Sequence, residues 1–288
     1  MVKKALPAFL LSCILVLSPG CTISTNWASE AKYADLHQAE DYSDDRSLRA
    51  EIDLKVGDLE LKAGDPSKIY ELDLHYNELA FTPDVKFRRS GEEALLNIRL
   101  EGSSHPFNHS GQNRLNLRLN REVSLDLNVS TGVSSNDLDL TGMTVKRLVL
   151  QCGVGETRLT MLDPTRGACD LVEISSGVGA LEVIGLGNFN FRKLKFNGGV
   201  GESTLDFSGE WNEVGTVQVD IGIGSVQILL PRDIGAELTI TKSFFSSSEI
   251  EGFVKRGDTY YSDNLDRVDR VLKLQIRSGI GEIEVDWL

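Results

Sequence analysis

Residues 148–161, LVLQCGVGETRLTM, decide the fold of this chain. Apolar residues alternate along 148–152 and again along 157–161, and the corner Gly153-Val154-Gly155 separates the two runs. Alternation with a period of two is typical of a strand with one buried face. Because glycine reaches backbone angles that other residues reach only at a cost, we predict that the strand bends at this corner. We expect the central valine to point inward.

The same pattern recurs along the chain, with the corners about 21 to 24 residues apart over most of its length. The predicted structural corners are the glycine pairs Gly153 and Gly155, Gly177 and Gly179, Gly199 and Gly201, Gly222 and Gly224, and Gly279 and Gly281. A weaker copy stands at Gly132, and an early copy surrounds Val56-Gly57. We therefore predict an all-β, solenoid-like stack of strand-corner-strand rungs, in which Val178 and Val200 belong to one inward ladder.

The composition restricts the partners. The chain has 288 residues, enough for one large or two modest domains, and its formal net charge is -13. Nucleic acids and anionic lipid surfaces attract basic patches, so an acidic chain is poorly suited to either. We expect no nucleic-acid partner.

The first residues are typical of an export signal. Residues 1–20 place Lys3 and Lys4 before an apolar run that is too short for an ordinary membrane helix. The phrase Leu17-Ser-Pro-Gly-Cys21 resembles a bacterial lipobox, which implies lipidation of Cys21 and a membrane anchor. If the host is Gram-negative, Thr22 resembles an outer-membrane signal. The alternative is ordinary secretion with Cys21 incidental.

Four segments follow from the pattern. We predict a signal peptide at 1–20, a polar tether or short helix at 21–46, an N-terminal β domain at 47–142 and a C-terminal repeat domain at 143–288. A polar loop at 102–113 interrupts the first β domain, and an excursion at 232–270 interrupts the second.

A family resemblance rests on residues 51–61 (EIDLKVGDLEL), Pro83, residues 116–119 (NLRL) and the Gly-Val-Gly-Glu corners. These resemble the toast_rack family of bacterial envelope proteins. Residues 219–231 and 281–285 are similar to the C-terminal domain of LiaF-like, cell-wall-antibiotic-response proteins. The resemblance implies an extracytoplasmic β-rich domain, attached in some relatives to regulators of membrane-damage sensing. Those regulators carry membrane helices that this sequence does not show, which leaves the regulatory role open.

No catalytic or metal motif emerges. Cys152 and Cys169 fall at opposite ends of their predicted strands, too far apart for a disulfide, so we expect free thiols. His105 and His109 share the polar loop without the further ligands that a zinc site needs. Glu156, Glu202 and Glu282 are read either as a cation row or as spaced charges on a solvated face. We expect no cofactor and no metal.

We predict that the excursion at 232–270 carries the function. Phe244, Phe245, Tyr260 and Tyr261 concentrate aromatic residues there, and we predict that they bind an envelope protein partner; the alternative is a flap that caps the last rungs. The outward residues of the first strands are polar and free of aromatics, which offers sugars no stacking surface. We therefore expect a non-enzymatic contact protein, a scaffold, adhesin-like module or accessory of envelope-stress sensing. The alternative function is an envelope polysaccharide-degrading β-helix enzyme.

Overall fold

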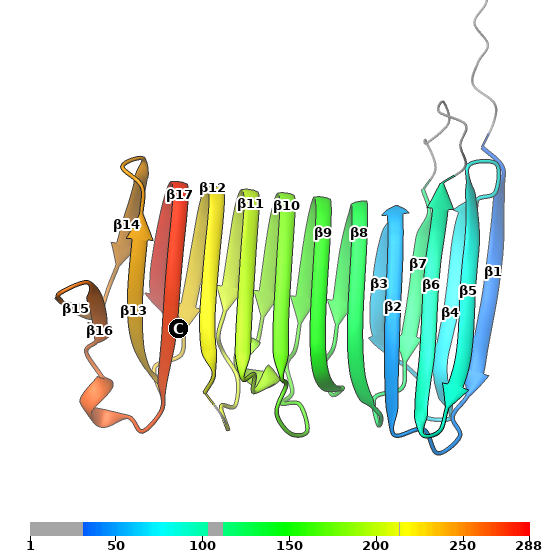
Figure 1. Ribbon diagram of the computed structural model, residues 1–288, viewed down its shortest axis with the longest axis horizontal. Helices are drawn as coiled ribbons and strands as arrows, with labels where there is room; N and C mark the ends of the chain where they lie inside the picture. Colours follow the sequence, from blue (N-terminus) through cyan, green and yellow to red (C-terminus); the bar gives the residue numbers. More distant parts are fainter. Residues whose placement is uncertain (1–30, 103–111, 213) are drawn as a thin grey trace, which may run out of the picture. The chain divides into compact units, whose positions relative to one another are not determined.

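The computed structural model describes residues 31–102, 112–212 and 214–288. Within these residues the chain is all-β, as predicted, and its strands form one large, mixed, mostly parallel sheet (Figure 1). The strands are β1 (Tyr33–Asp41), β2 (Ser47–Val56), β3 (Asp58–Ala63), β4 (Lys68–Asn77), β5 (Phe81–Ser90), β6 (Glu93–Gly102), β7 (Arg114–Leu119), β8 (Ser124–Asp139), β9 (Thr144–Thr160), β10 (Leu171–Ile184), β11 (Lys193–Asp206), β12 (Thr216–Leu230), β13 (Gly235–Lys242), β14 (Ser246–Ile250), β15 (Phe253–Arg256), β16 (Thr259–Ser262) and β17 (Val271–Trp287). Two short 3-10 helices, η1 (Leu186–Phe189) and η2 (Leu265–Arg267), complete the description.

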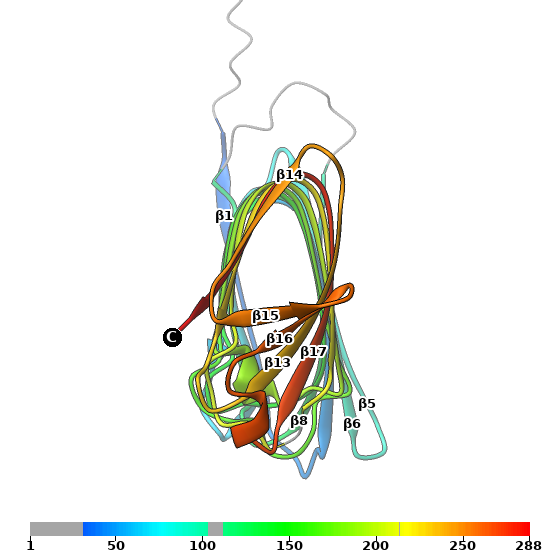
Figure 2. The same ribbon diagram turned by 90° about the vertical axis from the view of Figure 1, so that its left-hand side faces the viewer.

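Six long strands carry the repeat. Strands β8, β9, β10, β11, β12 and β17 each run up to a corner, bend and run down again, so that each has a first limb before the corner and a second limb after it. Each pairs with the next in parallel, through both limbs and in register. Figure 2, a view along the stack, shows the bent strands superposed as one arch.

The remaining strands extend the same two limbs. Strand β2 continues the first limb and β3 the second, around the predicted early corner at Val56 and Gly57. Strands β6 and β7 follow them in parallel, and the antiparallel strands β5 and β4 come next. Among the described residues, β5 pairs with β6 alone, so Pro83 stands in an edge strand, where a missing backbone donor is tolerated.

Strand β1 corrects one prediction. Residues 33–41 were expected within a tether or a short helix, but they pair antiparallel with β4, from Tyr33 opposite Asn77 to Asp41 opposite Lys68. Their burial alternates only between exposed and half-buried residues, a weaker signal than that of a core strand. The predicted signal peptide and Cys21 lie outside the described residues.

Side chains that point into the arch form the core. Leu148 and Leu150 of β9 lie beside Val172 and Ile174 of β10, and all four are fully buried. The predicted apolar ladders along both limbs are thus confirmed. Near η1, the rings of Phe191, Phe207 and Trp211 pack together, with centroids 5.6 to 6.5 Å apart.

The prediction for the central corner residues was wrong. Val178 and Val200 occupy one ladder, but their side chains point outward, with 48% and 46% of their surface exposed. The prediction assumed that alternation continues to the valine and changes phase only after it. The bend instead changes the phase at the first glycine, so the residue at the apex faces solvent. The inward ladders resume on the second limb at Leu159 and its equivalents.

The excursion also differs from the prediction. Strand β12 pairs directly with β17, so the two rungs on either side of the excursion are neighbours in the sheet. Residues 235–250, however, form a further rung beyond β17: β13 pairs with its first limb and β14 with its second. The repeat therefore continues in space without its glycine pair, and the last strand of the chain lies between two rungs that precede it in sequence.

Candidate functional site

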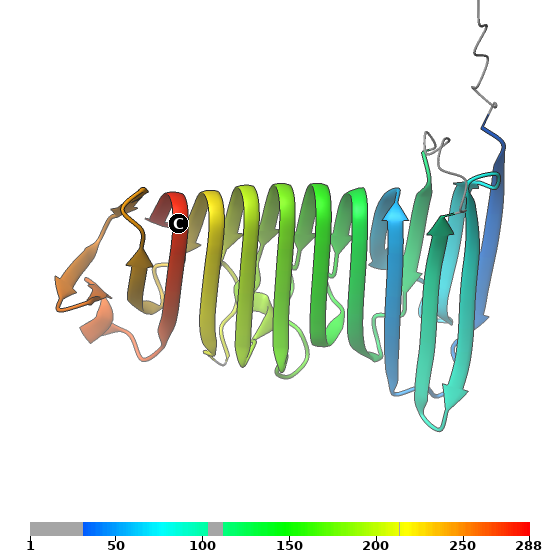
Figure 3. The ribbon, with the colours of Figure 1, turned by 45° about the horizontal axis from the view of Figure 1, so that its top comes forward.

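The corners of the six long strands present a row of exposed aliphatic side chains, which we call the crest. The crest consists of Val133, Val154, Val178, Val200, Ile223 and Ile280. Each residue lies directly opposite the next in the parallel register, and between 46% and 56% of each is exposed. Figure 3 shows the corners side by side along the top of the sheet. At about 4.8 Å per strand, the crest is about 24 Å long.

Glycines make the crest a narrow ridge. A Cβ on Gly177 would stand 2.4 Å from the carbonyl oxygen of Gly153, and a Cβ on Gly179 would stand 1.8 Å from that of Gly155. Gly179 also has φ +139°, a conformation that residues with side chains rarely adopt. At these corners a side chain on either flanking residue would therefore collide with the backbone of the neighbouring strand. The corner of β8 is the exception, because Ser134 stands at the second flanking position and its side chain is buried. The valine or isoleucine between the two flanking residues is left as the single projecting group of each corner.

A spaced row of carboxylates borders the crest on its second-limb side. Glu156, Glu202 and Glu282 occupy alternate strands. Ala180 and Ser225 stand between them, and Ser135 and Ser247 stand at the two ends of the row. All three glutamates are exposed, and within the described part of the chain they take part in no ion pair. The spacing keeps like charges from standing directly opposite one another. This arrangement fits spaced charges on a solvated face, one of the two interpretations of these glutamates.

A buried polar cluster lies beneath the start of the crest. The amide of Asn136 donates to the hydroxyls of Thr131, Ser134 and Thr157 at 2.9 to 3.2 Å. It also contacts the sulfur of Cys152 at 3.8 Å. Burial raises the pKa of the Cys152 thiol, and burial raises that of Cys169 to about 12. Both cysteines are free thiols, and both are protonated at neutral pH, which suits packing groups better than nucleophiles.

The aromatic residues of the excursion do not form one site. Phe244 and Phe245 lie at the corner between β13 and β14, where they are 96% and 72% exposed and pack edge-to-face. The amide of Gly281 donates to the Phe245 carbonyl at 3.3 Å, which places the pair next to the end of the crest. Tyr260 and Tyr261 belong instead to β16, which pairs with β13 at residues 237–239. Their role in partner binding stays a prediction.

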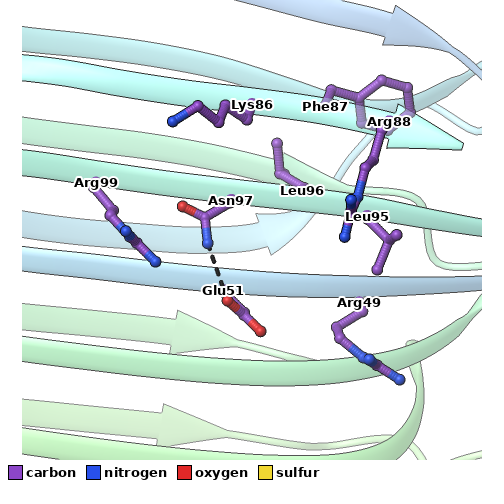
Figure 4. Close-up of a pocket in the computed structure, with 9 residues that line it drawn as sticks. All are labelled: Arg49, Glu51, Lys86, Phe87, Arg88, Leu95, Leu96, Asn97 and Arg99. Atoms are coloured by element: carbon purple, nitrogen blue, oxygen red, sulfur yellow. Dashed lines mark hydrogen bonds between the residues drawn. The ribbon is translucent and has the colours of Figure 1, made fainter.

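A shallow depression of about 340 Å³ crosses the outer face of β2, β6 and β5 (Figure 4). Arg49, Lys86, Arg88 and Arg99 line it together with Glu51, and acidic side chains lie beside three of these four basic residues. Arg99 stands between Asp84 and Asp53 in the register, and Arg49 pairs with Glu93 at 3.1 Å. Lys86 pairs with Asp84 at 2.6 Å. This face is a mixed-charge surface rather than an anion site.

The two histidines in the described part of the chain each pair with a carboxylate. His37 lies 2.7 Å from Asp73, and His75 lies 2.7 Å from Asp35, so that two reciprocal pairs join β1 to β4. No group of three or more potential metal ligands occurs among the described residues. His105 and His109 lie outside them. In the part of the chain that the structure describes, no helix is long and apolar enough to cross a membrane.

Two protein-family models match the chain. The model of the N-terminal domain of toast_rack (DUF2154) matches residues 27–184, more than half of the chain. The chain belongs to the toast_rack family. The model described as "Cell wall-active antibiotics response LiaF, C-terminal" matches residues 178–285. The two matches meet within β10, and neither model is that of an enzyme family. The domain boundary at 142/143 stays a prediction.

Solved structures resemble the chain at low identity. One described as a "putative cell adhesion protein" from Clostridium sporogenes is 16% identical, with a TM-score of 0.46, over 89% of this chain and all of that one. One described as a "putative adhesin" from Bacteroides fragilis is 11% identical, with a TM-score of 0.35, over 88% of this chain and 97% of that one. No curated protein matches the chain. We draw nothing about function from these likenesses.

Sequence reasoning missed the crest, although its signal was present. Five of the six corners place a valine or isoleucine between two glycines, which cannot shield it, and Val133 stands between Gly132 and Ser134. An inward position would not have required glycine on both sides. The recurrence of a β-branched residue at the apex was the available clue.

Proposed function

We propose that this member of the toast_rack family is a non-enzymatic protein of the bacterial envelope that acts by protein contact, as a scaffold, an adhesin-like module or an accessory of envelope-stress sensing. The parallel stack of bent strands serves it as a solenoid-like scaffold. In this proposal the chain is exported and anchored through lipid on Cys21, in the outer membrane if the host is Gram-negative.

The crest is the observation that carries the proposal. Six aliphatic side chains in one line are half exposed, on a surface whose neighbouring rows are polar or charged. Scattered apolar residues are common on protein surfaces, but a contiguous apolar row bordered by polar residues marks an interaction site. The LiaF-like C-terminal domain, which contributes four of the six crest residues, supports a place in the response of the envelope to wall-active compounds.

Site-specific photo-crosslinking in intact envelopes tests the proposal. A photoreactive residue at Val178 should yield a discrete protein adduct, because this position lies in the middle of the crest. The matched control carries the same residue at Leu171, at the start of the same strand, on the outer face of the first limb and seven residues before Val178. If the two positions give the same adducts, or if Val178 gives none, the crest is not the contact surface.

Two further variants sharpen the test. In the Val178 photoreactive protein, V154S and V200S remove the neighbouring crest side chains and should abolish the adduct. In the same background, F244S and F245S test whether the exposed aromatic pair extends the contact surface beyond the crest. Loss of the adduct with the phenylalanine changes alone would move the contact to the end of the stack.

A further inference from the structure

We propose that the crest docks an amphipathic α-helix of a partner protein, with a heptad pattern of apolar residues flanked on one side by lysine or arginine. The proposal rests on the proposed function, because it names the chemistry of the partner that the crest would contact. It concerns the crest and the glutamates at 156, 202 and 282, which we call the carboxylate row.

Charge is the first argument. Glu156, Glu202 and Glu282 are exposed, border the apolar ridge and have no ion-pair partner within the described residues. The row on the other side of the crest runs through Gln151, Ser175 and Asn197, which are neutral, to Asp220 and Arg277, which pair with each other, so this row carries no net charge. A partner that covers the ridge must therefore face negative charge on one side only. Lysine or arginine at that edge would complement it.

Spacing is the second argument. Two successive strands present two crest residues and one carboxylate within about 9.6 Å. One heptad of an α-helix presents two apolar positions and one flanking position within about 10.5 Å. The two repeats differ by about 1 Å, so they stay in step over the two and a half repeats of the crest. A helix of about 16 residues would span its length.

Other occupants fit less well. A second copy of this chain would bring another net charge of -13 and another carboxylate row to the contact. An anionic lipid surface would be repelled for the same reason. The flanking glycines leave the ridge narrow but open along its whole length, so a long, continuous partner is favoured over a compact ligand.

A binding measurement with a defined probe tests the inference. The probe is a 21-residue peptide with leucine at the a and d positions, lysine at e and alanine elsewhere; a second peptide carries glutamate at e. Binding is followed by fluorescence anisotropy with residues 31–288 fused to a carrier protein, and with the full chain in detergent. The lysine peptide should bind and the glutamate peptide should not. Raising the salt from 20 mM to 500 mM should weaken binding several-fold, because exposed pairs are screened.

Variants separate the two parts of the inference. E156Q/E202Q/E282Q should weaken binding of the lysine peptide roughly tenfold, since each exposed ion pair contributes modestly. The matched control, E40Q/E210Q/E251Q, removes the same charge away from the crest and should leave binding unchanged. V154S/V178S/V200S should abolish binding without loss of folding, which a thermal melt checks.

Each outcome decides between the proposals. If V154S/V178S/V200S loses peptide binding, V154S/V200S loses the crosslink from position 178 in envelopes, and the glutamate variant loses only peptide affinity, the inference stands. If the crosslink persists as a crest-dependent adduct while the lysine peptide fails to bind, the contact function survives and the basic helix is wrong. If the parent protein self-associates and the crest variant does not, the occupant is a second copy. If neutral phosphatidylcholine vesicles compete for the crest, the occupant is lipid.

Discussion

At the scale of single residues, exposure at the apex separates the crest from the core. Val178 and Ile174 lie in the same strand, four residues apart, yet one is half exposed and the other fully buried. The difference arises because the strand bends between them and the side chain at the apex turns outward. Aliphatic residues of one strand thus build the core at one position and the exposed crest at another.

We expect V178S to change the free energy of unfolding by no more than about 0.5 kcal/mol, as is usual for surface substitutions. By contrast, I174A should cost about 2 to 5 kcal/mol, because it removes buried atoms and leaves a cavity. Urea denaturation of both variants measures the difference. Equal losses would show that the crest valine is part of the core after all.

The corner glycines should be less replaceable than other glycines with positive φ. G179A places a Cβ 1.8 Å from the Gly155 oxygen at φ +139°, so neighbouring strands must move apart. Gly167 has φ +87° with nothing within 4 Å of the new Cβ. We expect G167A to cost about 1 to 2 kcal/mol and G179A clearly more, as judged by urea midpoints. Similar midpoints would argue against close contact at the corners.

At the scale of elements, the sequence predicted the strands with regular apolar alternation and missed those without it. Strand β9 shows the alternation on both limbs, whereas β5 carries Pro83 and β1 buries no residue fully. Alternation of apolar and polar residues indicates a strand with one buried face. An edge strand that is held mainly by backbone hydrogen bonds buries little of either face, so its sequence shows little alternation. The direction of the crest was missed for a related reason: alternation applies to a straight strand, and the corner is not straight.

Strand β1 should be held in part by Asp73, and this contribution should depend on pH. A hydrogen bond from His37, followed by the neighbouring Arg118, lowers the pKa of Asp73 below its ordinary value. A carboxyl group whose pKa is depressed by folding contributes stability above its unfolded pKa of about 3.9, and that contribution is lost as the pH falls through the folded pKa. The stabilised form is the carboxylate.

Urea midpoints of the parent and of D73N should therefore differ at pH 5 and above, and the difference should close as the pH falls below 4. H37A should reproduce part of the difference at pH 5, because it removes the largest cause of the shift. A difference that stays constant down to pH 2.5 would show that Asp73 does not respond to its partners in this way.

At the scale of the whole described fold, the last rung completes the sheet. Strands β13 and β14 cover the edge of β17 that β12 leaves open, and Trp287 donates to the Glu251 carbonyl at 2.9 Å while stacking on Phe253. The excursion thus acts as an end cap, the alternative that the sequence left open beside partner binding. An open strand edge is a template for pairing with another chain, and a cap prevents it.

Replacing residues 241–264 by a short Gly-Ser linker should leave a folded protein, because β12 pairs with β17 without help from the excursion. It should also expose the second limb of β17 where β14 now pairs, from Gly281 to Val285. We therefore expect a lower melting temperature by circular dichroism and concentration-dependent association by light scattering. F244S/F245S in the full chain is the control: it removes exposed apolar surface but keeps β14, so it should remain unassociated. A deletion variant that stays monomeric at high concentration would contradict the capping role, and one that is unfolded at every concentration would show that the long strands need the last rung in order to fold.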